Sequence, residues 1–174
     1  MIPEEIIEEK EDSKIKKILI ILMAIFLIFL ITSYIVGGNL LQILESLSES
    51  KKAENKIIYA DNIIINFQEN TYEKLQELYL NNQDVEIVAC LKGEKINEIY
   101  EIKELFIPKI SEQTVSHVSY NPCPNSTLIT LHSHPYKRCI ASQTDINNLK
   151  EVKQRNLNTL MVIMCQPDRF SVYE

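Results

Sequence analysis

Residues 127–145 read TLITLHSHPYKRCIASQTD and join a short apolar run to two histidines, a proline and an S-x-x-D quartet. The threonines, leucines and isoleucine at the start predict a β-strand. On a strand, side chains two residues apart point to the same face, with Cα atoms about 6.6 Å apart. His132 and His134 can therefore reach one metal ion from the end of this strand.

The residues after the histidines predict how the chain turns toward a third ligand. Pro135 cannot continue a β-ladder, so we expect the strand to end there. Residues 143–156 are predicted as a helix with Asp145 in its first turn. Ser142 and Asp145 match a capping box, which on its own explains an acid at that position. A single histidine is also more often an ordinary core or surface residue than a ligand. It is the combination that indicates a metal site.

The combined pattern, H-S-H-P followed by S-Q-T-D, resembles the H-x-H-x(7)-S-x-x-D signature of the JAMM (MPN+) zinc metalloprotease family. The resemblance covers residues 57–174. It extends to residues 86–93, EIVACLKG, which resemble the family's E-x-x-G-L-L-x-G segment in spacing but depart from it at Ala89 and Cys90. Without this resemblance, an acid at a strand start such as Glu86 is ordinarily a solvated edge residue.

The resemblance implies both a fold and an activity. The fold is a mixed, mostly antiparallel β-sheet flanked by helices, similar to cytidine deaminases. The activity is hydrolysis of peptide or isopeptide (amide) bonds, including those of ubiquitin-like modifier conjugates. One zinc ion is expected, with an open position for water. The implied residues are the metal ligands His132, His134 and Asp145, the general base Glu86, and Ser142 near the developing oxyanion.

The patterns outside this stretch agree with an α/β domain. Residues 59–67 predict a strand, and Asn70 with Glu73 predicts the start of a helix that runs to about Leu80. Residues 84–92 and 95–107 predict a hairpin that turns at Gly93-Glu94. Further predicted strands cover residues 115–120, 157–165 and 169–174.

The N-terminal part predicts a membrane anchor. Residues 18–36 are uncharged and apolar, and their number is close to what one membrane-spanning helix needs. We expect a charged tail (1–17), a transmembrane helix (18–38), a juxtamembrane helix and linker (39–56) and the hydrolase domain (57–174). Lysines at 14, 16 and 17 favour an N-terminus in the cytoplasm. A single-pass membrane protein is therefore expected, with its orientation left open.

The four cysteines are not spaced as in a zinc knuckle. Cys139 has three interpretations: a disulfide with Cys123, which we rank first, a transient zinc ligand, or an idle thiol. Cys90 and Cys165 lie in apolar strands and are expected to be small core residues. His117 lies outside the motif and is treated as an ordinary strand residue.

Charge and composition limit the function classes. The formal net charge is −6, and no basic run is long enough to bind a nucleic-acid backbone. Nucleic acid is therefore not an expected partner. Two alternatives to the peptidase hypothesis stay open: a non-catalytic, membrane-tethered scaffold of the same fold, and a hydrolase of small amide-linked metabolites. The sequence does not indicate the oligomeric state or the physiological substrate.

Overall fold

The computed structural model describes the backbone of residues 4–115, 117–135 and 138–174, and the side chains within these ranges except for residues 4–13 and 37–43. The chain divides into two compact units, Met1–Gln42 and Ile43–Glu174. We describe each unit by itself.

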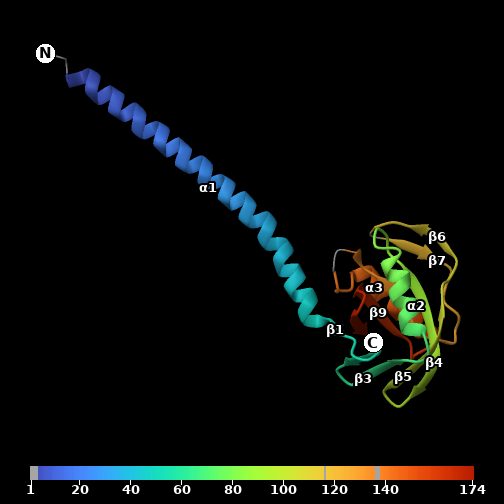
Figure 1. The fold of residues 1–174 in the computed structure, drawn as a ribbon. Helices are drawn as coiled ribbons and strands as arrows, with labels where there is room; N and C mark the ends of the chain where they lie inside the picture. Colours follow the sequence, from blue (N-terminus) through green and yellow to red (C-terminus); the bar gives the residue numbers. More distant parts are fainter. Residues whose placement is uncertain (1–3, 116, 136–137) are drawn as a thin grey trace. The chain divides into compact units, whose positions relative to one another are not determined.

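The first unit consists of helix α1 (Glu4–Glu49), which continues into the second unit (Figure 1). The segment Lys14–Val36 has a mean hydropathy of 3.0 and is long and apolar enough to cross a membrane. Its side chains are exposed throughout, as expected of a helix that would meet lipid. A signal sequence near an N-terminus has the same properties. The juxtamembrane helix predicted after Gly37-Gly38 is not separate, because α1 runs through both glycines.

The second unit is built on an eight-stranded sheet with the order β1-β10-β9-β8-β4-β5-β3-β2. Among the described strands, β3–β5 and β8–β9 are parallel pairs, and the other neighbours are antiparallel. The strands are β1 (Lys51–Lys52), β2 (Ile57–Ala60), β3 (Ile63–Phe67), β4 (Val88–Ile96), β5 (Ile99–Phe106), β8 (Thr127–Ser133), β9 (Leu160–Gln166) and β10 (Arg169–Tyr173). The expected class, a mixed α/β unit with a mostly antiparallel sheet, is confirmed.

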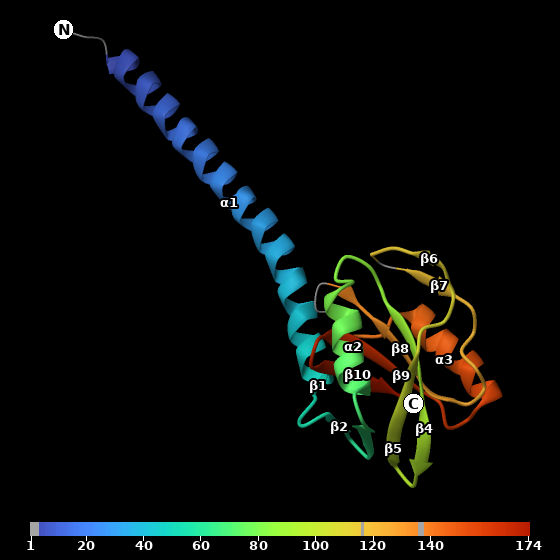
Figure 2. The ribbon, with the colours of Figure 1, turned by 45° about the vertical axis from the view of Figure 1, so that its right-hand side comes forward.

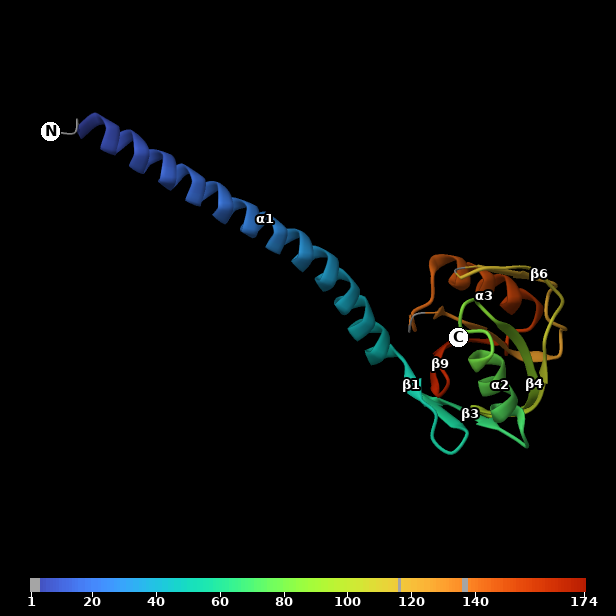
Figure 3. The same ribbon diagram turned by 45° about the horizontal axis from the view of Figure 1, so that its top comes forward.

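Two helices cover opposite faces of the sheet (Figure 3). Helix α2 (Thr71–Leu80) packs Tyr72 and Leu75 onto the main hydrophobic core, which includes Leu91, Leu131 and Val162. The alternate residues of the same strands face the other side, where α3 (Gln143–Arg155) buries Leu149. The sheet thus separates an apolar core from a second face that carries polar groups.

A small second sheet pairs β6 (Ile110–Gln113) with β7 (Val118–Tyr120). In Figure 2 this hairpin lies at the end of the domain opposite to the β4–β5 turn. Residues 115–120 were predicted as a strand, and β7 occupies the last three of them. Strand β6 was not predicted, because its sequence ISEQ has little apolar character.

Two turns of the structure do not lie where the sequence patterns predicted: one interrupts a predicted strand, and the other is displaced along a predicted hairpin. The single strand expected at residues 59–67 is part of a hairpin, with Asp61 at a positive φ of 47° in its turn. The turn expected at Gly93-Glu94 falls instead at Asn97, whose φ is 55°. Gly93 lies inside β4 at a register shift, and a Cβ atom there would collide with the Glu101 carbonyl. Its glycine is explained by close strand approach and not by a turn.

The range predicted as a juxtamembrane helix and linker, 39–56, belongs in part to the folded unit. Strand β1 pairs with β10 at the sheet edge. The buried Ser46 accepts a hydrogen bond at 2.9 Å from the Cys139 backbone N–H. Arg169 donates hydrogen bonds to Ser50 and to the Leu47 carbonyl. These contacts lie within the unit that begins at Ile43.

The predicted pairing of the cysteines was wrong. Cys90 forms a disulfide with Cys123, and Cys139 forms one with Cys165. Cys90 lies on the α3 side of β4 and faces the loop that carries Cys123. Cys165 lies on the same side of β9. Each cysteine outside the strands therefore pairs with a cysteine of a strand, and Cys123 and Cys139 do not pair with each other. We call the first pair the groove disulfide, because Cys123 lines the cavity described below, and the second the ligand-loop disulfide, because Cys139 lies between His134 and Asp145.

Candidate metal centre

Strand β8, which lies between β4 and β9 in the sheet, carries His132, and His134 follows directly after its last residue, Ser133. His132 lies opposite Val88 of β4, and the His134 backbone N–H donates to the Met164 carbonyl of β9 at 3.1 Å. Both side chains lie on the α3 face, with exposed fractions of 8% and 9%. The strand that the apolar run predicts therefore presents two buried imidazoles side by side.

Helix α3 brings the third candidate ligand, Asp145, to them. Ser142 is the N-cap: its Oγ accepts from the Asp145 N–H at 3.2 Å, and its own N–H donates to Asp145 Oδ2 at 2.7 Å. This capping box fixes the carboxylate in the first helical turn, where the helix dipole also favours a negative charge. The capping role of Asp145 is therefore compatible with a role as a metal ligand, because the cap orients the carboxylate toward the histidines.

The three side chains converge on one point. The Nε2 atoms of His132 and His134 are 3.2 Å apart. His132 Nε2 lies 3.3 Å from Asp145 Oδ1, and His134 Nε2 lies 3.4 Å from Asp145 Oδ2. This group could hold a metal ion. For ligands 2.0–2.1 Å from a tetrahedral zinc, geometry requires ligand atoms about 3.3 Å apart. The separation of the two Nε2 atoms fits that size, as does the distance from each of them to its own Asp145 oxygen. With one atom taken from each residue, the three candidate ligand atoms lie within 4.8 Å of one another.

Hydrogen bonds are also compatible with this arrangement, because His132 Nε2 and His134 Nε2 each lie close to a different oxygen of the Asp145 carboxylate, at 3.3 Å and 3.4 Å. Burial alone would raise the pKa of Asp145, but hydrogen bonds from His132 and His134 hold its pKa well below the ordinary range. The carboxylate is therefore ionised and available as a ligand across the physiological pH range.

Glu86 lies next to this cluster through strand register. Since Val88 is opposite His132, the antiparallel pairing places Glu86 opposite His134, on the same face as both histidines. Its exposed fraction is 9%, and the charges of His134, His132 and Asp145 all act on it. Burial raises the pKa of Glu86, while the two histidines oppose that effect. A carboxylate with a raised pKa is suited to general base catalysis.

The backbone of Glu86 and of the next residue, Ile87, is held by hydrogen bonds from residues that sequence reasoning missed. Ser133, between the two histidines, accepts a hydrogen bond at 3.0 Å from the Ile87 N–H, and its own N–H donates to the Ile87 carbonyl. From β6, Gln113 Nε2 donates to the Glu86 carbonyl at 2.7 Å, and the Glu86 N–H donates to the Thr114 carbonyl. The sequence did carry a signal for Ser133: a serine on the apolar face of a strand is buried, and a buried hydroxyl needs a hydrogen-bond partner.

Ser142 lies beside the cluster with its oxygen accepting from Asp145, an interaction that does not consume the hydroxyl proton. It is more exposed than the ligands. The structure therefore brings all five predicted site residues to one end of β8 and α3.

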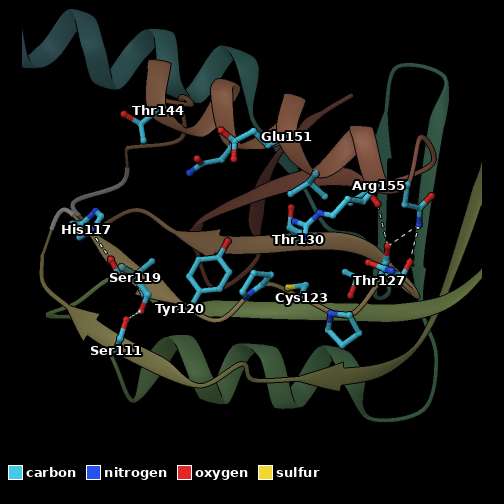
Figure 4. Close-up of a pocket in the computed structure, with 18 residues that line it drawn as sticks. Ser111, His117, Ser119, Tyr120, Cys123, Thr127, Thr130, Thr144, Glu151 and Arg155 are labelled. Carbon is cyan, nitrogen blue, oxygen red and sulfur yellow. Dashed lines mark hydrogen bonds between the residues drawn. The ribbon is translucent and has the colours of Figure 1, made fainter.

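A cavity of about 410 Å³ lies beside the metal centre, between α3 and β7 (Figure 4). One helical stripe of α3 forms one wall, and it consists of Thr144, Asn148, Glu151, Val152 and Arg155. Strand β7 forms the other wall, and Thr130 of β8 contributes to the floor. None of the metal ligands lines this cavity. It begins next to them, since Thr144 precedes Asp145, and it extends away along the helix.

His117, treated from the sequence as an ordinary strand residue, lines the end of this cavity that Thr144 also lines. Its Nε2 is 2.8 Å from Ser119 Oγ, and its charge acts on Glu86. The Cys123 end of the groove disulfide lines the same cavity.

Comparison with known proteins adds no family assignment to this geometry: no family model matches the chain, and no curated protein sequence matches it significantly.

Proposed function

We propose that this chain is a zinc-dependent hydrolase of amide bonds in peptides or isopeptides, with the JAMM-type fold that its H-x-H-x(7)-S-x-x-D motif resembles. The observation that carries the proposal is the convergence of His132, His134 and Asp145 on one point, with Glu86 beside them. Two imidazoles and one carboxylate leave an open fourth position, which distinguishes a catalytic zinc site from a structural one.

The roles of the side chains follow from their positions. When bound, zinc supplies Lewis acidity that activates water at neutral pH. Glu86 accepts the proton of the attacking water and passes it to the departing amine nitrogen, so that no charged nitrogen anion has to leave. Its burial supports both transfers, because the raised pKa lies closer to neutral pH than that of an exposed glutamate.

Ser142 supplies a hydrogen-bond donor for the oxygen of the tetrahedral intermediate. Its oxygen is fixed by the Asp145 N–H, so the hydroxyl is positioned before the substrate arrives. A donor that is already oriented stabilises charge that develops only in the transition state.

The adjoining cavity favours an extended peptide over a small metabolite. From Thr144 to Arg155 the wall of α3 advances by eleven helical steps of about 1.5 Å, or about 16 Å. An extended chain advances 3.2–3.4 Å per residue, so this wall accommodates about five residues. The polar side chains of Asn148, Glu151 and Arg155 line this wall and can form hydrogen bonds with the backbone or the polar side chains of a bound peptide.

The experiment uses the full chain purified in detergent, stripped with a chelator and reloaded with zinc. We expect about one zinc per chain and hydrolysis of peptides from a library with the metal restored. Glu86→Gln should keep the zinc and lose activity, whereas His132→Ala should lose both. Glu104→Gln, an exposed acid on β5, is the matched control and should change neither. Absence of stoichiometric zinc, or full activity in Glu86→Gln, refutes the proposal.

A further inference from the structure

The pairing of the cysteines bears on where this domain works. The sequence holds four cysteines, and all four are in disulfides. The Cα atoms are 5.7 Å apart in the groove disulfide and 5.1 Å apart in the ligand-loop disulfide. Both separations are within the range that a disulfide requires. Three of the four residues, Cys90, Cys139 and Cys165, are fully buried.

Both disulfides fasten segments that border the candidate site. The groove disulfide attaches the loop after β7, which lines the cavity, to β4. The ligand-loop disulfide attaches the loop between His134 and Ser142 to β9. Each joins a cysteine outside the strands to a cysteine in a central strand, β4 or β9. Both bonds therefore hold segments that border the candidate site.

Disulfides of this structural kind form and persist in oxidising compartments and are rare in the cytosol. The usual cytosolic roles of cysteine do not account for these four, because no C-x-x-C pair is present and none of them belongs to the group of candidate metal ligands. The cysteines therefore indicate the non-cytoplasmic side of a membrane.

The charges around the apolar helix point independently to the same side. Lys14, Lys16 and Lys17 stand at its front edge, while Lys51 and Lys52, the first basic residues after Val36, lie at the limit of the distance over which flanking charge acts. Basic residues stay in the cytoplasm, so the chain after Val36 emerges on the opposite side. An apolar segment that served instead as a signal sequence would send the domain to that side as well.

From these two observations we infer that residues 43–174 fold and act on the oxidising, non-cytoplasmic face of the membrane. Resting on the proposed function, the inference also names the substrate class: a polypeptide exposed on that face, and not a conjugate of a cytosolic ubiquitin-like modifier. The cavity along α3, which accommodates about five residues, then binds an extended segment of an exported or surface-exposed polypeptide.

Side-specific labelling tests the location without any use of activity. Leu157, with an exposed fraction of 82%, is replaced by cysteine in the full chain, and spheroplasts that express it are treated with a membrane-impermeant maleimide. We expect full labelling before detergent is added. The matched control is Glu9→Cys, ahead of the span, which should label only after detergent. The reverse pattern overturns the inference.

Thiol counting and substrate addition complete the test. Acid-quenched membranes should show no alkylatable thiol in the unsubstituted chain and one in Cys90→Ser. Four free thiols overturn the inference. Intact spheroplasts should cleave an added impermeant peptide as fast as lysed ones, and Glu86→Gln should not; cleavage that needs lysis also overturns it. A domain labelled from outside that binds no zinc would overturn the proposed function alone, whereas a zinc-dependent hydrolase facing the cytoplasm would overturn this inference alone.

Discussion

Removal of the ligand-loop disulfide should weaken both the fold and the hold on zinc. The bond closes a loop with a sequence separation of 26, and the groove disulfide closes one of 33. In the chain-entropy account, each then stabilises the folded state by about 3.5 kcal/mol. For a unit of this size that free energy corresponds to a loss of roughly 12 °C in Tm when either bond is removed. The two disulfides are therefore matched in their effect on stability.

They are not matched in their effect on the metal. The ligand-loop disulfide fixes the segment that connects His134 to Asp145, whereas the groove disulfide fixes a wall that holds no ligand. Loss of support around a ligand typically lowers metal affinity roughly 10- to 100-fold. We expect that loss in the double variant Cys139→Ala/Cys165→Ala and a near-unchanged affinity in Cys90→Ala/Cys123→Ala.

The assay measures zinc affinity by competition with a chromophoric chelator, on the full chain in detergent, at a temperature well below both values of Tm. Heat unfolding followed by circular dichroism provides the stability of each variant. An equal loss of zinc affinity in the two double variants would mean that general loosening is responsible, and the positional argument would be refuted. Unchanged affinity in both would refute it as well.

Four further predictions concern single side chains. Burial raises the pKa of Glu86, so folding favours its protonated form, and the zinc-free protein should gain stability as pH falls through that pKa. Glu86→Gln should therefore be more stable than the parent at neutral pH but not at acidic pH. Urea unfolding with a chelator present measures both effects. The same variant should lose amide hydrolysis on the order of 10²- to 10⁴-fold. Zinc at 100 times its Kd should raise the free energy of unfolding by about 2.7 kcal/mol, and His134→Ala should abolish that gain. Arg155→Ala should raise KM about tenfold for peptides that fill the groove, with no change for dipeptide substrates, as steady-state kinetics can show.

The local features of the site could be predicted because they depend on short-range geometry. The alternation of a strand places His132 and His134 on one face whatever the rest of the chain does. The capping box of Ser142 and Asp145 also involves only neighbouring residues, and both of its hydrogen bonds are present. The apolar run at residues 18–36 sets the character of its helix by composition alone.

Features that join distant segments required the tertiary structure. The approach of Glu86 to His134 depends on the register between β4 and β8. Ser133 supports it through a hydrogen bond with Ile87, and Gln113 of β6 through a hydrogen bond to the Glu86 carbonyl. The cysteine pairs depend on strand order, since β9, β8 and β4 are neighbours although 160–166, 127–133 and 88–96 are far apart in sequence.

The sequence by itself determined the candidate ligand types, their spacing and the apolar helix, because each follows from the repeat of a single strand or helix. Only the tertiary structure decided that Asp145 lies against the two imidazoles, that Glu86 lies beside them, and which cysteines are joined. The physical reason is that loop closure and strand register are settled by packing of the whole sheet, for which local sequence carries no measure of distance.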